Sequence, residues 1–158
     1  MKFGQDFEKI FFKLSLQKPK YLEAIKKGFY TSEEIDALHY LATKFHEKFH
    51  ESPSKEQMKL LVQRGKKEVD EDLIDIIYAA DLSQYDEEWM TSTAESWIKW
   101  RNFDTTLIDT IEYIKTTQVN PENVDGIISK VKTLINDRNS LTFNSDLGLD
   151  FFNPTDHF

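Results

Sequence analysis

The chain has 158 residues, a net charge of −8 and a hydrophobic fraction of 39%, which are typical of one folded domain and exclude a disordered chain. Five glycines and four prolines are too few for the many turns of an all-β fold, and the absence of cysteine excludes disulfide scaffolds, thiolate metal sites and cysteine nucleophiles. No apolar run approaches the roughly 20 residues that cross a bilayer, and charges near the N-terminus interrupt any secretory signal pattern. We therefore expect a soluble, cytoplasmic, all-α protein.

The charge is divided unevenly along the chain. Residues 1–67 contain 14 Lys and Arg against 9 Asp and Glu, whereas residues 68–158 contain 6 against 19. This asymmetry indicates two sub-structures with different surfaces, and the acidic half should repel nucleic acid. A solvated helix face explains the densest basic cluster better than a nucleic-acid contact does, so we expect DNA contact to be weak or indirect. That cluster comprises Lys55, Lys59, Arg64, Lys66 and Lys67.

Residues 1–82 show helical periodicity that predicts a head of about five short helices. The first helix has its apolar stripe around Phe7 and Phe11, and a short second helix lies between Pro19 and Gly28. Capping signals mark the starts of the next three helices at Thr31 with Glu34, at Ser54 with Gln57, and at Asp70. The predicted inward stripe of the third helix is Ile35, Leu38, Ala42, Phe45 and Phe49.

Residues 83–140 predict a long antiparallel helical hairpin. The helical pattern continues without Gly or Pro from Asp86 to about Gln118, which corresponds to a length on the order of 45 Å. Asn120-Pro121 then begins a second helix that ends near Asn139. Two helices leave much of their apolar surface open to water, so either the head or a second molecule must cover it. We expect a second copy, because the hairpin extends farther than a compact head can cover.

One segment matches a catalytic pattern. His46-Glu47-Lys48-Phe49-His50 has the H-E-x-x-H spacing that places two imidazoles over zinc. However, Lys48 puts a charge inside a motif that is normally buried, Phe49 belongs to the predicted core stripe, and no third ligand follows. A zinc metallopeptidase is therefore only a remote alternative. The glycines form no phosphate-binding loop, and we predict no catalytic, cofactor-binding or metal-binding residue in this chain.

The order of these pieces resembles a known family. The segment DLSQYDEEW at residues 81–89 leads into a helix with Trp97 and Arg101, and the tail DLGLDFFN occupies residues 146–153. Together with the ESPS turn at residues 51–54, they resemble the N-terminal domain and linker start of DnaB-like replicative DNA helicases of the bacteriophage type. The resemblance divides the chain into a head at 1–82, a hairpin at 83–140, and a linker start at 141–158 that precedes a RecA-like ATPase.

The resemblance implies a collar domain that assembles the helicase hexamer and docks a primase or a helicase loader. ATP and Mg²⁺ are implied only for the full-length parent helicase, in a bacterial or phage-infected cell, and this chain by itself is not expected to be an enzyme. A stand-alone helical accessory protein, either a loader or a primase-binding factor, is the alternative. The implied hairpin and inter-subunit contacts are Trp97, Trp100, Phe103, Leu107, Ile127, Val131 and Leu134. The implied linker contacts are Leu147, Leu149, Phe151 and Phe152.

Overall fold

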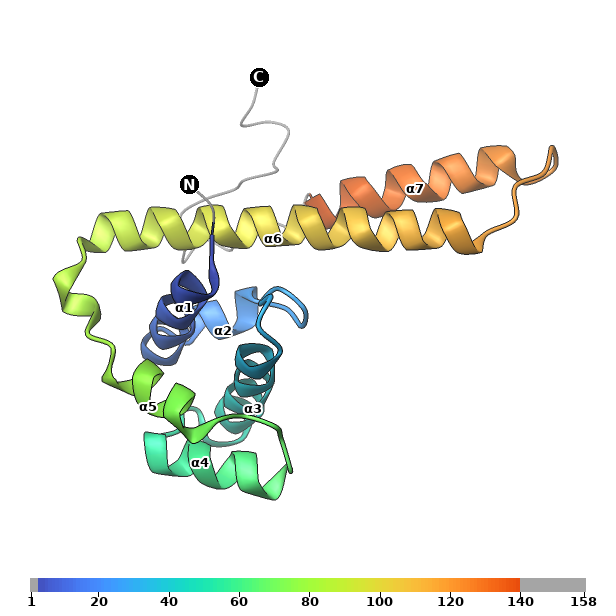
Figure 1. Ribbon diagram of the computed structural model, residues 1–158. Helices are drawn as coiled ribbons and strands as arrows, with labels where there is room; N and C mark the ends of the chain where they lie inside the picture. The colour runs from blue at the N-terminus through green and yellow to red at the C-terminus, as the bar shows by residue number, and fades with distance from the viewer. Residues whose placement is uncertain (1–2, 140–158) are drawn as a thin grey trace. The chain divides into compact units, whose positions relative to one another are not determined.

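The computed structural model describes residues 3–139 of the chain. Within these residues, every element of regular secondary structure is a helix. The all-α prediction is therefore confirmed for these residues, and the predicted linker start at 141–158 lies outside them. Figure 1 shows the elements in chain order. They are α1 (Gln5–Gln17), α2 (Lys20–Ala24), α3 (Glu33–Phe49), α4 (Lys55–Arg64), α5 (Glu71–Ala79), the 3₁₀ turn η1 (Leu82–Gln84), α6 (Glu87–Thr116) and α7 (Val124–Asn139).

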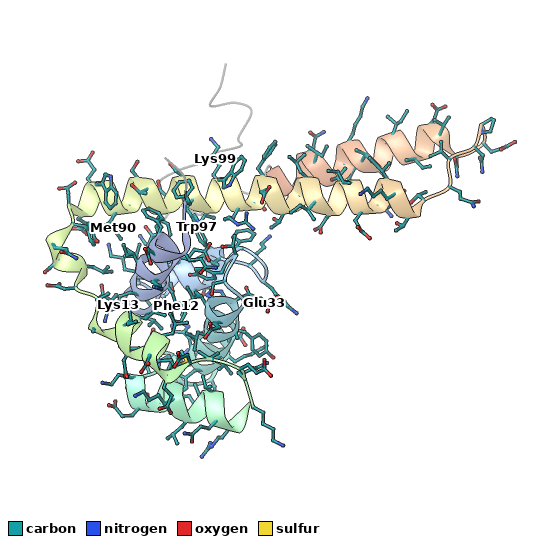
Figure 2. All side chains as sticks on the ribbon, in the orientation of Figure 1. Phe12, Lys13, Glu33, Met90, Trp97 and Lys99 are labelled. Carbon is teal, nitrogen blue, oxygen red and sulfur yellow. The ribbon has the colours of Figure 1, made fainter. Side chains whose placement is uncertain are left out.

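The chain divides into two compact units, Met1–Ile98 and Lys99–Phe158. The N-terminal unit is the predicted head together with the first turns of α6, so it reaches beyond the boundary expected at residue 82. Met90 and Trp97 point from these turns toward α1 (Figure 2), and both side chains are buried. Burial of these two residues explains why the head includes the start of the long helix.

Helix α1 is the centre of the N-terminal unit, because it packs against α2, α3 and α5. The core is rich in aromatic and branched side chains, which follow the three- and four-residue spacing of helices that bury one face. Hydrogen bonds between residues far apart in the sequence also connect these helices. Lys13 Nζ donates to the Tyr78 carbonyl at 2.6 Å, and Ser52 Oγ donates to the Leu16 carbonyl at 2.6 Å. The largest of the fully buried apolar side chains are Phe11, Phe12, Tyr21, Leu22, Ile35, Leu38, Met58, Ile74, Ile77 and Trp97.

Two of the three helix N-caps that were predicted from the sequence are present in the structure. Ser54 and Gln57 form the expected reciprocal capping box of α4, and the Asp70 side chain accepts the Asp72 N–H at the start of α5. The prediction for α3 is wrong, because Ser32 rather than Thr31 is its N-cap, and the Ser32 hydroxyl accepts the Ile35 N–H at 3.3 Å.

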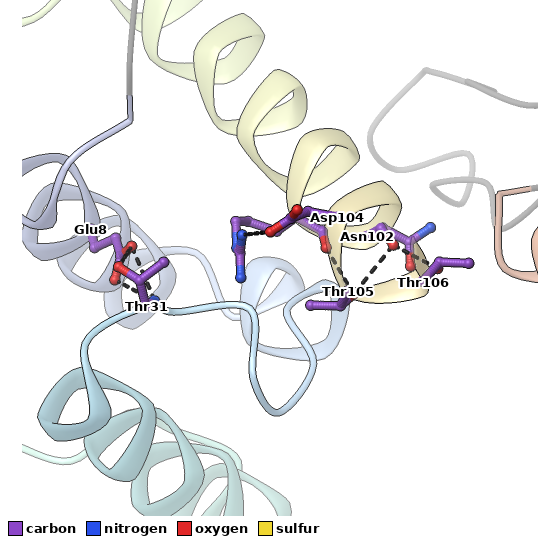
Figure 3. A network of polar contacts seen from close by, with 7 residues as sticks. Glu8, Thr31, Asn102, Asp104, Thr105 and Thr106 are labelled. Carbon is purple, nitrogen blue, oxygen red and sulfur yellow. Dashed lines mark hydrogen bonds and ion pairs between the residues drawn. The ribbon is translucent and has the colours of Figure 1, made fainter. Parts of the chain in front are cut away.

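Thr31 is displaced from the cap by a buried carboxylate. Glu8 on α1 is completely buried and accepts the Thr31 N–H at 2.9 Å and the Thr31 hydroxyl at 2.6 Å (Figure 3). It also accepts the Ser32 N–H at 3.1 Å. These N–H groups precede α3, where the helix dipole also favours negative charge. A long-range contact therefore decides which of two adjacent hydroxyl residues caps the helix.

The second unit contains the remainder of α6 and the antiparallel helix α7, as predicted for a hairpin (Figure 1). The two helices are in contact, because Lys130 Nζ lies 4.9 Å from the centre of the Tyr113 ring. At the turn, Asn120 Oδ1 accepts the N–H groups of Glu122 and Asn123, and α7 begins at Val124 rather than at Pro121. Within residues 3–139, no helix combines the length and apolar character that crossing a bilayer requires.

Candidate self-association surface

The hairpin unit has a row of large apolar side chains that are open to solvent. We call this row the α6 stripe and define it as Trp100, Phe103, Leu107, Ile111 and Ile114. Their spacing of three and four residues places them on one face of the helix. Each is between 36% and 51% exposed, and the Trp100 and Phe103 rings lie 6.2 Å apart.

The buried positions of α6 in this unit are polar. Asn102, Thr106 and Thr110 are all buried. The Thr106 hydroxyl donates to the Asn102 carbonyl at 2.6 Å (Figure 3). The Thr110 hydroxyl donates to the Thr106 carbonyl at 2.7 Å. Each hydroxyl is thus satisfied inside its own helix, and burying it leaves no unpaired donor.

The hairpin therefore buries small polar residues and exposes large apolar ones on the same helix. The hydrophobic effect alone favours the reverse arrangement. Contiguous exposed apolar surface of this kind marks an interaction site in soluble proteins. Ile108 lies beside the α6 stripe, and Ile128 is an exposed residue of α7 in the same unit; they are 56% and 48% exposed.

Charged side chains on α6 accompany the stripe. Glu112 and Lys115 are exposed near its C-terminal end, whereas Arg101 is buried and forms an ion pair with Asp104 one turn away. Apolar residues accompanied by charges of both signs resemble the core and rim of a protein interface more than a hydrophobic ligand pocket.

The seven expected contact residues fall into three groups. Trp100, Phe103 and Leu107 lie on the α6 stripe. Ile127, Val131 and Leu134 are half-buried on α7.

Trp97 forms the third group, because it is completely buried in the N-terminal unit and stacks on Phe11 at 4.9 Å and near Tyr30 at 5.1 Å. It is a core residue of the folded head, and we therefore do not place it in the proposed interface. The four expected linker contacts lie outside the described residues: Leu147, Leu149, Phe151 and Phe152.

Among the exposed apolar residues of this unit that the expected contact set omitted are Ile111, Ile114 and Ile128. The first two continue the same three- and four-residue spacing beyond Leu107, so periodicity alone was sufficient to include them. Ile128 lies one residue beyond Ile127 on α7, and only the tertiary structure distinguishes the exposed one from its half-buried neighbour.

The zinc-like motif lies at the end of α3. His50 follows the last helical residue and adopts a left-handed backbone with φ of 59°, which ends the helix. Phe49 is 52% exposed, so its assignment to the core stripe is wrong, whereas Ile35, Leu38 and Ala42 are buried as predicted. Among the residues that the structure describes, no three His, Asp or Glu side chains lie close enough together to hold a metal ion.

Comparison with known proteins does not assign this chain. No protein-family model, no curated protein and no solved structure matches it.

Proposed function

We propose that the chain is the N-terminal collar domain, with the linker start, of a hexameric DnaB-like replicative DNA helicase. In this role it joins subunits and docks a primase or a helicase loader. The observation that carries the proposal is the α6 stripe, an apolar face that the described part of the chain leaves uncovered. The resemblance of residues 81–89 and 146–153 to this helicase family supports the choice of family.

The partner that we infer for the α6 stripe is a second copy of the chain. Trp and Phe are side chains that dominate interface energetics, and two of the five stripe residues are of this type. Burying five half-exposed apolar side chains from each of two copies contributes about 7–15 kcal/mol. The loss of translational and rotational freedom costs roughly 4–15 kcal/mol. The isolated chain should therefore associate weakly, and multivalency in a hexamer would strengthen the contact.

Sedimentation velocity at increasing protein concentration tests the proposal. The wild-type chain should associate, and Leu107→Glu combined with Ile111→Glu should make it monomeric, because two carboxylates would have to be buried in the contact. Lys27→Glu is the matched control, because it produces the same change in net charge at an exposed position of the N-terminal unit, away from the α6 stripe in the sequence. A wild-type chain that stays monomeric at high micromolar concentration would argue against a collar domain.

The alternative of a stand-alone accessory protein predicts a different outcome. A monomer that binds purified primase or loader through the α6 stripe would favour it. The coding sequence that follows Phe158 separates the two cases independently, because only a helicase parent requires a phosphate-binding loop downstream.

A further inference from the structure

Three aromatic rings from two parts of the sequence lie together at the start of α6. We call them the Trp89 patch and define it as Phe7, Tyr85 and Trp89. The Tyr85 and Trp89 rings are stacked, with centroids 5.6 Å apart and planes 23° apart, and the Phe7 ring of α1 lies nearly perpendicular to Trp89 at 6.2 Å. Trp89 is nevertheless 41% exposed. All three residues belong to the N-terminal unit.

Two side-chain caps fix the backbone that carries the patch. Asp86 Oδ2 accepts the Trp89 N–H at 2.9 Å, and Asp81 Oδ1 accepts the Ser83 N–H at 3.0 Å. These hydrogen bonds hold the η1 turn and the first turn of α6, on either side of Tyr85. A surface that is ordered in advance loses little conformational entropy when a partner binds. The exposed indole is therefore already in place for a contact.

The segment around the patch is strongly acidic. Residues 79–98 contain five Asp and Glu and no Lys or Arg, and only Glu95 among the five is buried. Lys18 pairs with Glu87 at 3.3 Å, but the Glu87 side chain is 85% exposed, and such a pair is weak enough for another cation to replace it. The helix dipole accounts for acidic residues in the first turn of α6, but it does not account for an exposed indole among them. The four exposed carboxylates are Asp81, Asp86, Glu87 and Glu88.

We propose that the Trp89 patch binds an arginine-bearing basic segment of a partner protein. A guanidinium group stacks on aromatic rings, and tryptophan is the best of these platforms. The neighbouring carboxylates attract the same group and accept its N–H donors in paired hydrogen bonds. Trp, Tyr and Arg are also the residues that dominate the energetics of protein interfaces. This contact shares no residue with the α6 stripe, so each can be present without the other.

A second copy of the chain matches the patch less well than a foreign basic segment does. The chain has three arginines, and Arg101 is buried and paired with Asp104. The basic cluster that the sequence suggested is partly neutralised, because Lys55 and Lys59 both face the Asp75 carboxylate, at 3.9 Å and 2.9 Å. The complementary charge is therefore scarce on the chain itself.

Nuclear magnetic resonance titration of the whole chain with a hexa-arginine peptide tests the proposal. The indole N–H signals of Trp89, Trp97 and Trp100 report on three separate places, and only that of Trp89 should shift on binding. A hexa-lysine peptide carries the same charge but lacks the planar group that stacks on a ring. It should therefore bind about threefold more weakly.

Trp89→Ala should weaken binding of hexa-arginine about tenfold and abolish the preference over hexa-lysine. Trp100→Ala is the matched control, because it removes an indole of similar exposure, 49%, outside the patch. This control should bind hexa-arginine as tightly as the wild type does.

The contribution of charge is tested separately. Glu87→Gln combined with Glu88→Gln should weaken binding about threefold at low salt and less at high salt, because exposed charges are screened. The matched control is Glu112→Gln combined with Glu122→Gln, which removes two exposed carboxylates of the hairpin unit and should have a smaller effect.

Circular dichroism verifies that each variant is folded before its affinity is interpreted. If Trp89→Ala does not fold, the Trp89 signal of the wild type and the Glu87 and Glu88 variant still decide the outcome. Equal affinity of wild type and folded Trp89→Ala, equal binding of the two peptides by the wild type, or equal effects of the two carboxylate pairs would overturn the proposal, since each indicates diffuse attraction. Loss of self-association in Trp89→Ala, measured by sedimentation velocity, would assign the patch to a contact between copies instead.

Discussion

Trp97 and Phe11 are stacked, with ring centroids 4.9 Å apart and ring planes 28° apart. Three residues farther along the same helix, Trp100 is 49% exposed. Two tryptophans that are nearly equivalent in the sequence pattern therefore have different roles. The first secures the start of α6 to the head, and the second belongs to the α6 stripe.

We predict that Trp97→Ala lowers the free energy of unfolding by about 3–5 kcal/mol, because it leaves a large cavity beside Phe11 and Tyr30. Trp100→Ala should lower it by less than about 1 kcal/mol and should instead weaken self-association. Urea denaturation and sedimentation velocity measure the two effects separately. Similar losses of stability in both variants would mean that Trp100 is also a core residue.

Glu8→Gln should destabilise the head by about 2 kcal/mol. The carboxylate accepts charge-assisted hydrogen bonds from Thr31 and Ser32, whereas an amide oxygen accepts them more weakly and the amide NH₂ group cannot accept the backbone N–H groups at all. Asp6→Asn is the control, because the Asp6 side chain is 99% exposed and pairs with Lys9 on the surface. Thermal or urea unfolding compares the two, and equal small effects would contradict this role of Glu8.

His39 should make the protein less stable in mild acid. Burial lowers the pKa of His39 below its ordinary value of 6.5, in spite of the opposing hydrogen bond from Nε2 to the Ile25 carbonyl at 2.8 Å. The unfolded chain therefore binds a proton before the native state does, and stability falls as the pH drops below 6.5 through the folded pKa. We expect His39→Gln to flatten this part of the curve of unfolding free energy against pH.

The control for His39 is His50→Asn, because His50 is exposed and asparagine tolerates its left-handed backbone. This control should keep the pH dependence of the wild type. A wild-type curve that is flat between about pH 7 and pH 5 would show that His39 is protonated equally in both states.

Glu95 should have the opposite effect on the pH dependence. It is 2% exposed, and among the described residues Oε1 has no hydrogen-bond partner. Burial raises the pKa of Glu95 above 4.5, although the positive charge of Lys20 acts in the other direction. The native state therefore keeps its proton longer than the unfolded chain does, and this contribution to stability is lost as the pH rises from 4.5 through the folded pKa.

The corresponding variant is Glu95→Gln. It should flatten the curve of unfolding free energy against pH in this range and leave stability at neutral pH within about 1 kcal/mol of the wild type. Measurement of urea unfolding at several pH values gives both quantities. A much larger loss at neutral pH would mean that the ionised carboxylate stabilises the fold.

Most of the secondary structure could be predicted, because helical periodicity and capping chemistry are local. The capping box at Ser54 and the cap at Asp70 depend on residues no more than three positions apart, and both predictions are confirmed. The α3 cap was missed because Thr31 is used by Glu8, a residue 23 positions earlier. A pattern that spans a few residues contains no information about a contact between residues so far apart in the sequence.

The candidate surface was predictable in part. Spacing places Trp100, Phe103 and Leu107 on one face of the long helix, and they are exposed together. The same spacing does not show which turns of the long helix are buried by other helices. It therefore could not distinguish Trp97, which is buried, from these three exposed residues. Phe49 was misassigned for the same reason, because a position on an apolar stripe is buried only where another element lies against it.

By itself, the sequence determined that this protein is helical, where most helices begin and end, and that a long hairpin follows a head of shorter helices. Those properties depend on backbone hydrogen bonds and side-chain spacing within a few residues. Only the tertiary structure decided that Trp97 is core while Trp100 is surface, that Glu8 binds the segment before α3, and that Phe7 lies against Trp89. Each of these depends on contacts between segments that are distant in the sequence, and burial is a property of the packed elements rather than of any one helix.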